Sequence, residues 1–168
     1  KNLIKEIIMN STYDTDAKFA LLIIALLLIA TGIAVVVYEK EQHNKPTIGD
    51  FFFAIAELET NHDSHAVHAG DEIGMYGITF NFWKDAVEYG HLTGSHEDCI
   101  DPTYSEAIMI AYYRRYASNS FYNQEWYNLA RIHHGGWNGM NRLHTKEYAE
   151  KVMNIINREV KIRYEKNS

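Results

Sequence analysis

The sequence has a single cysteine, Cys99, so no intrachain disulfide can form and the folded part must rely on its core. Positive charge is also in deficit, with 16 Lys and Arg against 22 Asp and Glu, a formal net charge of -6. Residues 1–38 are neutral, so the negative charge falls on residues 39–168. Because phosphate neutralisation drives nucleic-acid affinity, we expect no nucleic-acid partner.

All nine histidines lie between His43 and His144. Protonating them below about pH 5.5 would move the net charge from -6 towards +3. That change would suit an anionic polymer substrate in an acidic compartment. Histidines that are simply tolerated on the surface are the simpler interpretation, and we prefer it.

One segment has no charge at all. Residues 19–38 form an apolar run of 20, the length that an α-helix needs to cross a bilayer core of roughly 30 Å. Backbone groups in lipid must be satisfied within the segment, so we predict a single transmembrane helix. A buried core helix would have a polar face, and a cleaved signal peptide a shorter apolar run.

This segment divides the chain into predicted parts. They are an N-terminal tail (1–18), the transmembrane helix (19–38), a polar linker (39–46), a globular domain (47–160) and a C-terminal tail (161–168). More lysines precede the span than closely follow it, which favours the cytoplasmic (or equivalent) side for the N-terminus.

Helical signals dominate the globular part. Thr47 with Asp50 is a capping arrangement, and Asn61 would end that helix. Asp101 before Pro102 is a start signal for a later helix. Thr145 is the expected cap of the last one, with Tyr148 in its buried stripe. The glycine-rich residues 73–78 fit a small β-hairpin or irregular strand. We predict a mainly α, α+β globule of about five helices, over residues 47–60, 81–89, 101–116, 126–133 and from 145 onward.

Two glutamates stand near the end of the first globular helix. Glu57 and Glu59 are two residues apart, so they point to different faces and cannot both enter one cleft. The helix dipole and partial burial disfavour a carboxylate anion at Glu59, and the protonated form is what a general acid of glycoside cleavage requires. A solvated glutamate at a helix end is the simpler alternative.

Three short motifs occur in a specific order: Ala54-Ile-Ala-Glu-Leu-Glu59-Thr60, Gly74-Met-Tyr76-Gly-Ile78 and Ala130-Arg-Ile-His133-His-Gly135-Gly136-Trp-Asn-Gly139. Their order and spacing over residues 51–152 resemble the invertebrate-type (destabilase-like) lysozymes and their bacterial and viral relatives. In that family a Glu-Ser pair ends the first helix, a Gly-x-Tyr-Gln-Ile segment follows, and Ala-Arg-Ile-His-Asn-Gly-Gly-Pro closes the cleft. The resemblance implies a lysozyme-like fold.

The resemblance also implies roles for individual residues. Glu59 would be the general acid, and Asp71 the second carboxylate, acting as nucleophile or stabilising an oxocarbenium-like transition state. Asp63 and Glu72 remain alternatives for that second role, because the alignment of the loop is not fixed. The sugar-binding cleft would be lined by Tyr76, Ile78, His133, Gly135 and the stacking platform Trp137, whereas Trp83 and Trp126 are expected in the core.

The sequence departs from the family pattern at four cleft positions. Gly77 replaces Gln, His134 replaces Asn, Trp137 replaces Pro, and Thr60 replaces Ser. Animal members are rich in disulfides; this chain, like the microbial relatives, has none. The changes bear on substrate binding more than on the fold.

Potential metal ligands crowd residues 62–72, including His62, His65 and His68 with nearby acids. Their spacing matches no common zinc motif, so we expect a solvated loop, no metal and no cofactor.

Two functions from different classes follow. The first is a membrane-anchored muramidase, or a lytic transglycosylase, acting on peptidoglycan or a related amino-sugar polymer. The second is a catalytically inactive lysozyme-like subunit of a membrane-embedded assembly, which the altered cleft and the acidic charge favour. The retained Glu59 tips our expectation towards the enzyme.

Overall fold

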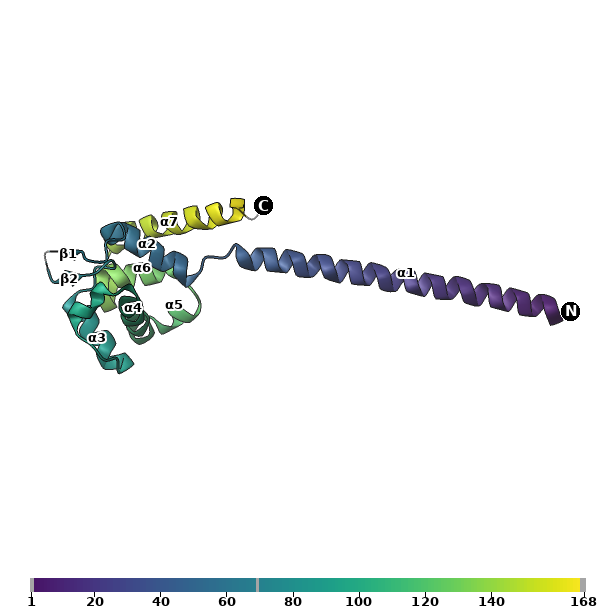
Figure 1. Ribbon diagram of the computed structural model, residues 1–168, viewed down its shortest axis with the longest axis horizontal. Helices are drawn as coiled ribbons and strands as arrows, with labels where there is room; N and C mark the ends of the chain where they lie inside the picture. Colours follow the sequence, from purple (N-terminus) through teal and green to yellow (C-terminus); the bar gives the residue numbers. More distant parts are fainter. Residues whose placement is uncertain (1, 69, 167–168) are drawn as a thin grey trace. The chain divides into compact units, whose positions relative to one another are not determined.

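The computed structural model describes residues 2–68 and 70–166, and the chain forms two compact units, residues 1–45 and residues 46–168. The first unit contains one helix, α1 (Asn2–His43) (Figure 1). Residues 18–38 of α1 are long and apolar enough to cross a membrane. Length and composition alone fit a signal sequence near an N-terminus equally well.

Helix α1 is longer than the predicted span. Most of the predicted tail (1–18) and the first part of the predicted linker (39–46) are helical. No proline precedes Pro46, and a helix that has nucleated adds residues at little cost. The helix ends three residues before Pro46, whose ring disfavours helical backbone at Lys45.

The described part of the second unit is built mainly from six helices, with two short strands and two 3-10 helices between them. Its elements are α2 (Ile48–Thr60), β1 (Val67–His68), β2 (Glu72–Ile73), α3 (Phe80–Gly90), η1 (His96–Ile100), α4 (Pro102–Tyr116), α5 (Ser118–Tyr122), α6 (Trp126–Gly135), η2 (Gly136–Asn141) and α7 (Thr145–Lys166). The mainly α prediction is confirmed, and the five predicted helices correspond to α2, α3, α4, α6 and α7. Helix α5 and the 3-10 helices are too short to produce a periodic pattern.

The predicted start and end of α2 are confirmed. Asp50 N donates to Thr47 Oγ1 at 3.3 Å and Thr47 N donates to Asp50 Oδ2 at 2.7 Å, a reciprocal capping box. Asn61 adopts a left-handed conformation (φ 53°) at the other end. The small hairpin is present too: Ile73 and Ile78 exchange two backbone hydrogen bonds of 3.0 Å, and β1 pairs antiparallel with β2.

The predicted cap of α7 was wrong. Thr145 is not a helix cap, because its side chain is buried and its hydroxyl lies 2.8 Å from the carbonyl of Gly139 and 2.7 Å from that of Arg142. The helix also runs past residue 160, through most of the predicted C-terminal tail, to Lys166. Arg163 pairs there with Asp50 at 2.6 Å, which ties the end of α7 to the start of α2.

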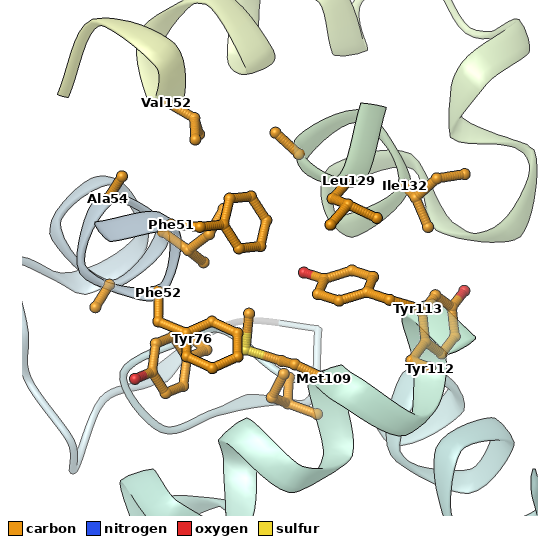
Figure 2. Packing of buried hydrophobic residues seen from close by; sticks show 14 of the residues in the cluster. Phe51, Phe52, Ala54, Tyr76, Met109, Tyr112, Tyr113, Leu129, Ile132 and Val152 are labelled. Atoms are coloured by element: carbon orange, nitrogen blue, oxygen red, sulfur yellow. The ribbon is translucent and has the colours of Figure 1, made fainter. Parts of the chain in front are cut away.

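The core is rich in aromatic rings contributed by several helices (Figure 2). Phe51 of α2 stacks on Trp126 of α6, with ring centroids 5.4 Å apart, and meets Tyr113 of α4 edge-on at 5.8 Å. Leu129 of α6 and Val152 of α7 are fully buried beside them. Since α2 and α6 both pack on α7, the C-terminal end of α2 is brought against these two helices.

Candidate active site

Glu57 and Glu59 have separate surroundings, as their spacing on α2 requires. Glu57 accepts two hydrogen bonds from the guanidinium of Arg158 on α7, and these bonds lower the pKa of the Glu57 carboxyl. Glu59 points the other way, into the space between α6, α7 and the segment after β2. Its side chain is 22% exposed, so solvent and ligands can reach a largely enclosed carboxyl.

The two oxygens of Glu59 have different neighbours. Tyr148 of α7 donates its hydroxyl hydrogen to Oε1 at 2.5 Å. Burial, followed by the negative charge of Glu59, raises the pKa of Tyr148 well above its ordinary value, so this hydroxyl stays a donor. Oε2 lies beside Gly77, where a Cβ atom would stand 3.3 Å from it. Oε1 is therefore held by the protein, and Oε2 is left beside a residue without a side chain.

His133 lies next to the acid as a neutral ring. Burial is the main cause that lowers its pKa, and its Nε2 stands 3.9 Å from Glu59 Oε1. Nε2 is 3.1 Å from the carbonyl of Tyr76, which can only accept, so the proton is on Nε2. Nδ1 then accepts from the hydroxyl of Tyr113 at 2.9 Å. This chain of bonds fixes the ring between α4 and the Tyr76 segment.

The lowered pKa of His133 makes the stability of the globule depend on pH. In the unfolded chain His133 has an ordinary pKa and binds a proton below about pH 6.5. In the folded state the same ring stays unprotonated to lower pH. The free energy of unfolding should therefore be highest above about pH 6.5. At lower pH it should decrease, by up to about 1.4 kcal/mol for each pH unit. Urea unfolding followed by tryptophan fluorescence at several pH values measures this slope.

His133→Gln should make the slope shallower, and the exposed His144→Gln should leave it unchanged. An equal slope in wild type and His133→Gln would show that His133 is not the group responsible.

A cleft of about 850 Å³ opens beside Glu59. Its walls come from the end of α2, from β2, from α3 and from the α6–η2 junction, and include Glu59, Glu72, Gly77, Phe82, His133, His134, Gly135, Gly136, Trp137 and Arg142. Its volume is within the range of about 300–1,000 Å³ usual for ligand sites. The predicted site residues Glu59, His133, Gly135 and Trp137 therefore share one cleft.

The other predicted site residues lie elsewhere. Tyr76 and Ile78 are 3% and 0% exposed and belong to the core. Neither is among the residues that line the cleft. Asp71 is exposed in the turn between β1 and β2, with a left-handed φ of 64°, outside the cleft wall. Its neighbour Glu72 lines the cleft. Asp63, the other alternative, is exposed in the loop after α2 and accepts a hydrogen bond from the backbone of His65.

Two further carboxylates in the cleft wall already have partners. Asp85 accepts from the hydroxyl of Tyr116 at 2.9 Å, and Glu88 forms a 3.0 Å ion pair with Arg115. Both lie on α3, and their bonds hold that helix to α4. Glu72 comes from the short hairpin instead, and it lines the cleft together with Glu59.

The η2 segment forms the far wall and is held by a buried arginine. Arg131 of α6 donates from Nη2 to the carbonyls of Met140 (2.7 Å) and Arg142 (3.1 Å), and from Nε to Thr145 Oγ1 (3.0 Å). These bonds fix a segment that carries Trp137, which is 65% exposed at the cleft. The prediction that Trp137 is exposed is confirmed, as is burial of Trp126.

Sequence reasoning missed Tyr148 and Tyr113 as parts of the site. Tyr148 was placed in the buried stripe of the last helix, which is correct, but its hydroxyl reaches Glu59, 89 residues earlier in the chain. A polar tip on an otherwise apolar helix stripe was the available signal, since buried tyrosine hydroxyls need partners. Among the described residues, no three His, Cys, Asp or Glu side chains gather where they could hold a metal ion.

The helical globule, its small hairpin and the glutamate at the end of the first globular helix define a mainly α, lysozyme-like protein. The family comparison agrees: residues 51–155 match the model of the Destabilase family, the invertebrate-type lysozymes. This match covers more than half of the chain, and the protein belongs to that family. No curated protein and no solved structure gives a significant match.

Proposed function

We propose that the lysozyme-like domain cleaves β-1,4 glycosidic bonds of peptidoglycan or a related amino-sugar polymer, with Glu59 as the general acid. The observation that carries this proposal is the setting of Glu59: Tyr148 donates to one oxygen, the other lies beside Gly77, and both Glu59 and Gly77 line a cleft of about 850 Å³. Membership of a lysozyme family supports the same reaction class.

In the proposed reaction, protonated Glu59 gives its proton to the glycosidic oxygen as the bond from that oxygen to the anomeric carbon breaks. Oε2 is the atom suited to carry this proton, because Oε1 already accepts from Tyr148. The sugar left behind develops positive charge, and a water molecule finally adds to the anomeric carbon and returns a proton to Glu59. Because His133 is neutral, it places no positive charge beside Glu59, where a cation would favour the ionised carboxylate over the protonated acid.

For the second carboxylate we propose Glu72 in place of Asp71. Glu72 shares the cleft wall with Glu59, whereas Asp71 faces solvent. A carboxylate there can stabilise the developing positive charge or attack the anomeric carbon. Trp137, His133 and Gly135 would then contact the sugar rings, with the exposed face of Trp137 as a stacking surface.

Product analysis tests the proposal. The full chain in detergent should reduce the turbidity of a peptidoglycan suspension and release fragments with one new reducing end per bond cleaved. Fragments ending in 1,6-anhydro sugars would instead indicate lytic transglycosylase chemistry, in which the sugar's own 6-hydroxyl replaces water. If neither product forms at any pH between 4 and 8, the enzyme proposal fails and the catalytically inactive lysozyme-like subunit becomes the better explanation.

We also propose that α1 anchors the domain in a membrane. Residues 18–38 have the length and composition of a span. After expression in a host with intact membranes, the full chain should stay in the membrane pellet through alkaline carbonate washing. A soluble product that has lost the chain up to the end of the apolar segment, near Tyr38, detected by mass, would identify the segment as a signal sequence.

A further inference from the structure

The segment that follows α6 exposes three large apolar side chains. Trp137 is 65% exposed, Met140 39% and Leu143 79%. Trp137 and Met140 stand one turn apart in the 3-10 helix η2, where side chains three residues apart eclipse, so both project from the same side. Leu143 follows two residues after the end of η2. We refer to Trp137, Met140 and Leu143 as the η2 rim.

Buried hydrogen bonds hold the η2 rim in place. Arg131 of α6 donates to the backbone carbonyls of Met140 at 2.7 Å and of Arg142 at 3.1 Å. The hydroxyl of Thr145 lies 2.8 Å from the carbonyl of Gly139. The segment therefore cannot turn its apolar side chains inwards without breaking these bonds. Single exposed apolar residues are common on protein surfaces, whereas several that gather on one fixed segment mark an interaction site.

The charge of this segment is opposite in sign to that of the whole chain. Residues 126–146 contain no Asp or Glu, although the chain carries a formal net charge of -6. Arg142 and Lys146 are exposed within this range. The next acid along the chain, Glu147, forms a 2.9 Å ion pair with Lys151. A negatively charged surface that approaches the η2 rim therefore meets cations and no unpaired carboxylate of the same segment.

Apolar side chains beside cations suit the surface of a bilayer that contains anionic lipids. Tryptophan rings lie preferentially at the level of the headgroups, leucine and methionine gain from contact with acyl chains, and lysine and arginine pair with phosphates. A sugar polymer is a poorer match, because Met140 and Leu143 offer little to hydroxyl and amide groups. These two residues also lie outside the lining of the 850 Å³ cleft.

A bilayer is also the partner that the chain itself can bring close. Residues 18–38 of α1 have the length and composition of a membrane span. Only three residues separate the end of α1 at His43 from Thr47, the N-cap of α2. A globule on so short a linker stays near any membrane that α1 crosses.

We propose that the η2 rim contacts the surface of a bilayer containing anionic lipids, with its three apolar side chains in the interface and Arg142 and Lys146 at the lipid phosphates. Because Trp137 also lines the cleft, this contact holds one edge of the cleft at the bilayer surface. The contact goes beyond the proposed catalytic function and needs no activity of Glu59.

Quenching of tryptophan fluorescence by brominated lipids tests the contact, because all three tryptophans lie in the globule and α1 contains none. The full chain is reconstituted into vesicles of phosphatidylcholine with brominated acyl chains, with and without about 30% phosphatidylglycerol. Vesicles with phosphatidylglycerol should quench the emission of one tryptophan relative to unbrominated vesicles, and pure phosphatidylcholine should quench it less. Trp137→Phe should abolish the quenching, since Trp126 is buried and Trp83 partly buried.

Met140→Ser with Leu143→Ser removes the other apolar side chains of the η2 rim and keeps Trp137 as the reporter. This variant should lose most of the quenching. The matched control is Val67→Ser with Ile100→Ser, which changes two apolar residues of similar exposure, 71% and 45%, outside η2. The control should be quenched like the wild type.

Flotation of the vesicles distinguishes this test from that of the anchor. A chain that floats with the vesicles but shows no quenching by bromine, or equal quenching in the Met140→Ser, Leu143→Ser variant, refutes the rim contact and leaves the anchor intact. Equal quenching in both lipid compositions refutes the preference for anionic lipid. Emission of Trp137 that is shielded from aqueous acrylamide but not quenched by bromine would indicate a protein partner, a second copy included, and would also refute the lipid contact. A chain that floats with neither composition refutes both the contact and the anchor.

Discussion

Glu59→Gln should lower the rate of peptidoglycan cleavage at least about a hundredfold, because positioned general acids contribute roughly 10²–10⁴ in rate. The amide has the same shape and its oxygen can still accept from Tyr148, so the fold should persist. It has no acidic proton, however, and the leaving oxygen would depart as a strong base. Initial rates of turbidity loss and of new reducing ends, at equal protein concentration, measure the effect.

Glu57→Gln is the matched control for this variant. Glu57 stands two residues earlier on the same helix, but its carboxylate faces Arg158 on the outside of the domain. An exposed ion pair is worth about 1 kcal/mol or less, and the pair is outside the cleft, so activity should stay within about twofold of wild type. Equal rates for Glu59→Gln and wild type would remove Glu59 from catalysis.

The elements that sequence predicted well are those specified by neighbours in the chain. Thr47 and Asp50 cap α2, and Asp101 before Pro102 caps α4. Each of these contacts spans three residues or fewer, so the local sequence is enough to predict it. The opposite directions of Glu57 and Glu59 also followed from helix geometry alone. Such signals need no knowledge of the rest of the fold, and they placed Glu59 in the last turn of α2.

The second carboxylate could not be chosen in this way. Asp71 and Glu72 are adjacent, and which of them enters the cleft depends on the turn between β1 and β2. There Asp71 adopts a left-handed φ of 64°, and His68 pairs with Glu72 across the hairpin. A shift of one residue in this pairing would exchange the faces of the two side chains. The register is set by tertiary packing of Ile73 and Ile78, which two-residue strands do not reveal in the sequence.

The wrong cap assigned to Thr145 and the missed contact of Tyr148 with Glu59 have a related cause. Threonine before an amphipathic stretch is typical of a cap, yet the side chain of Thr145 satisfies Arg131 and the carbonyl of Gly139. Tyr148 was correctly placed in the core, but its partner is Glu59 of another helix. In both cases the decisive contact joins residues far apart in the chain, where local patterns carry no information about which polar groups meet.

Gly139→Ala should destabilise the globule by about 3 kcal/mol or more, combining overpacking with the loss of buried hydrogen bonds. A Cβ at this position would stand 2.0 Å from the backbone oxygen of Arg131 and 3.1 Å from the Cα of Ile132, both in the rigid α6. The η2 segment would have to move away. That movement would break the bonds from Arg131 and Thr145 to the η2 carbonyls and displace Trp137 from the cleft.

Gly49→Ala is the control, because its Cβ in the first turn of α2 would meet only Thr47 Oγ1, at an ordinary 3.6 Å. It should be neutral or more stable by about 0.5–1 kcal/mol, since alanine is less flexible when unfolded. Urea unfolding followed by tryptophan fluorescence compares the two, and all three tryptophans lie in residues 46–168. Equal stability of the two variants would mean that η2 can shift freely, and Arg131 would then not be what holds Trp137 at the cleft.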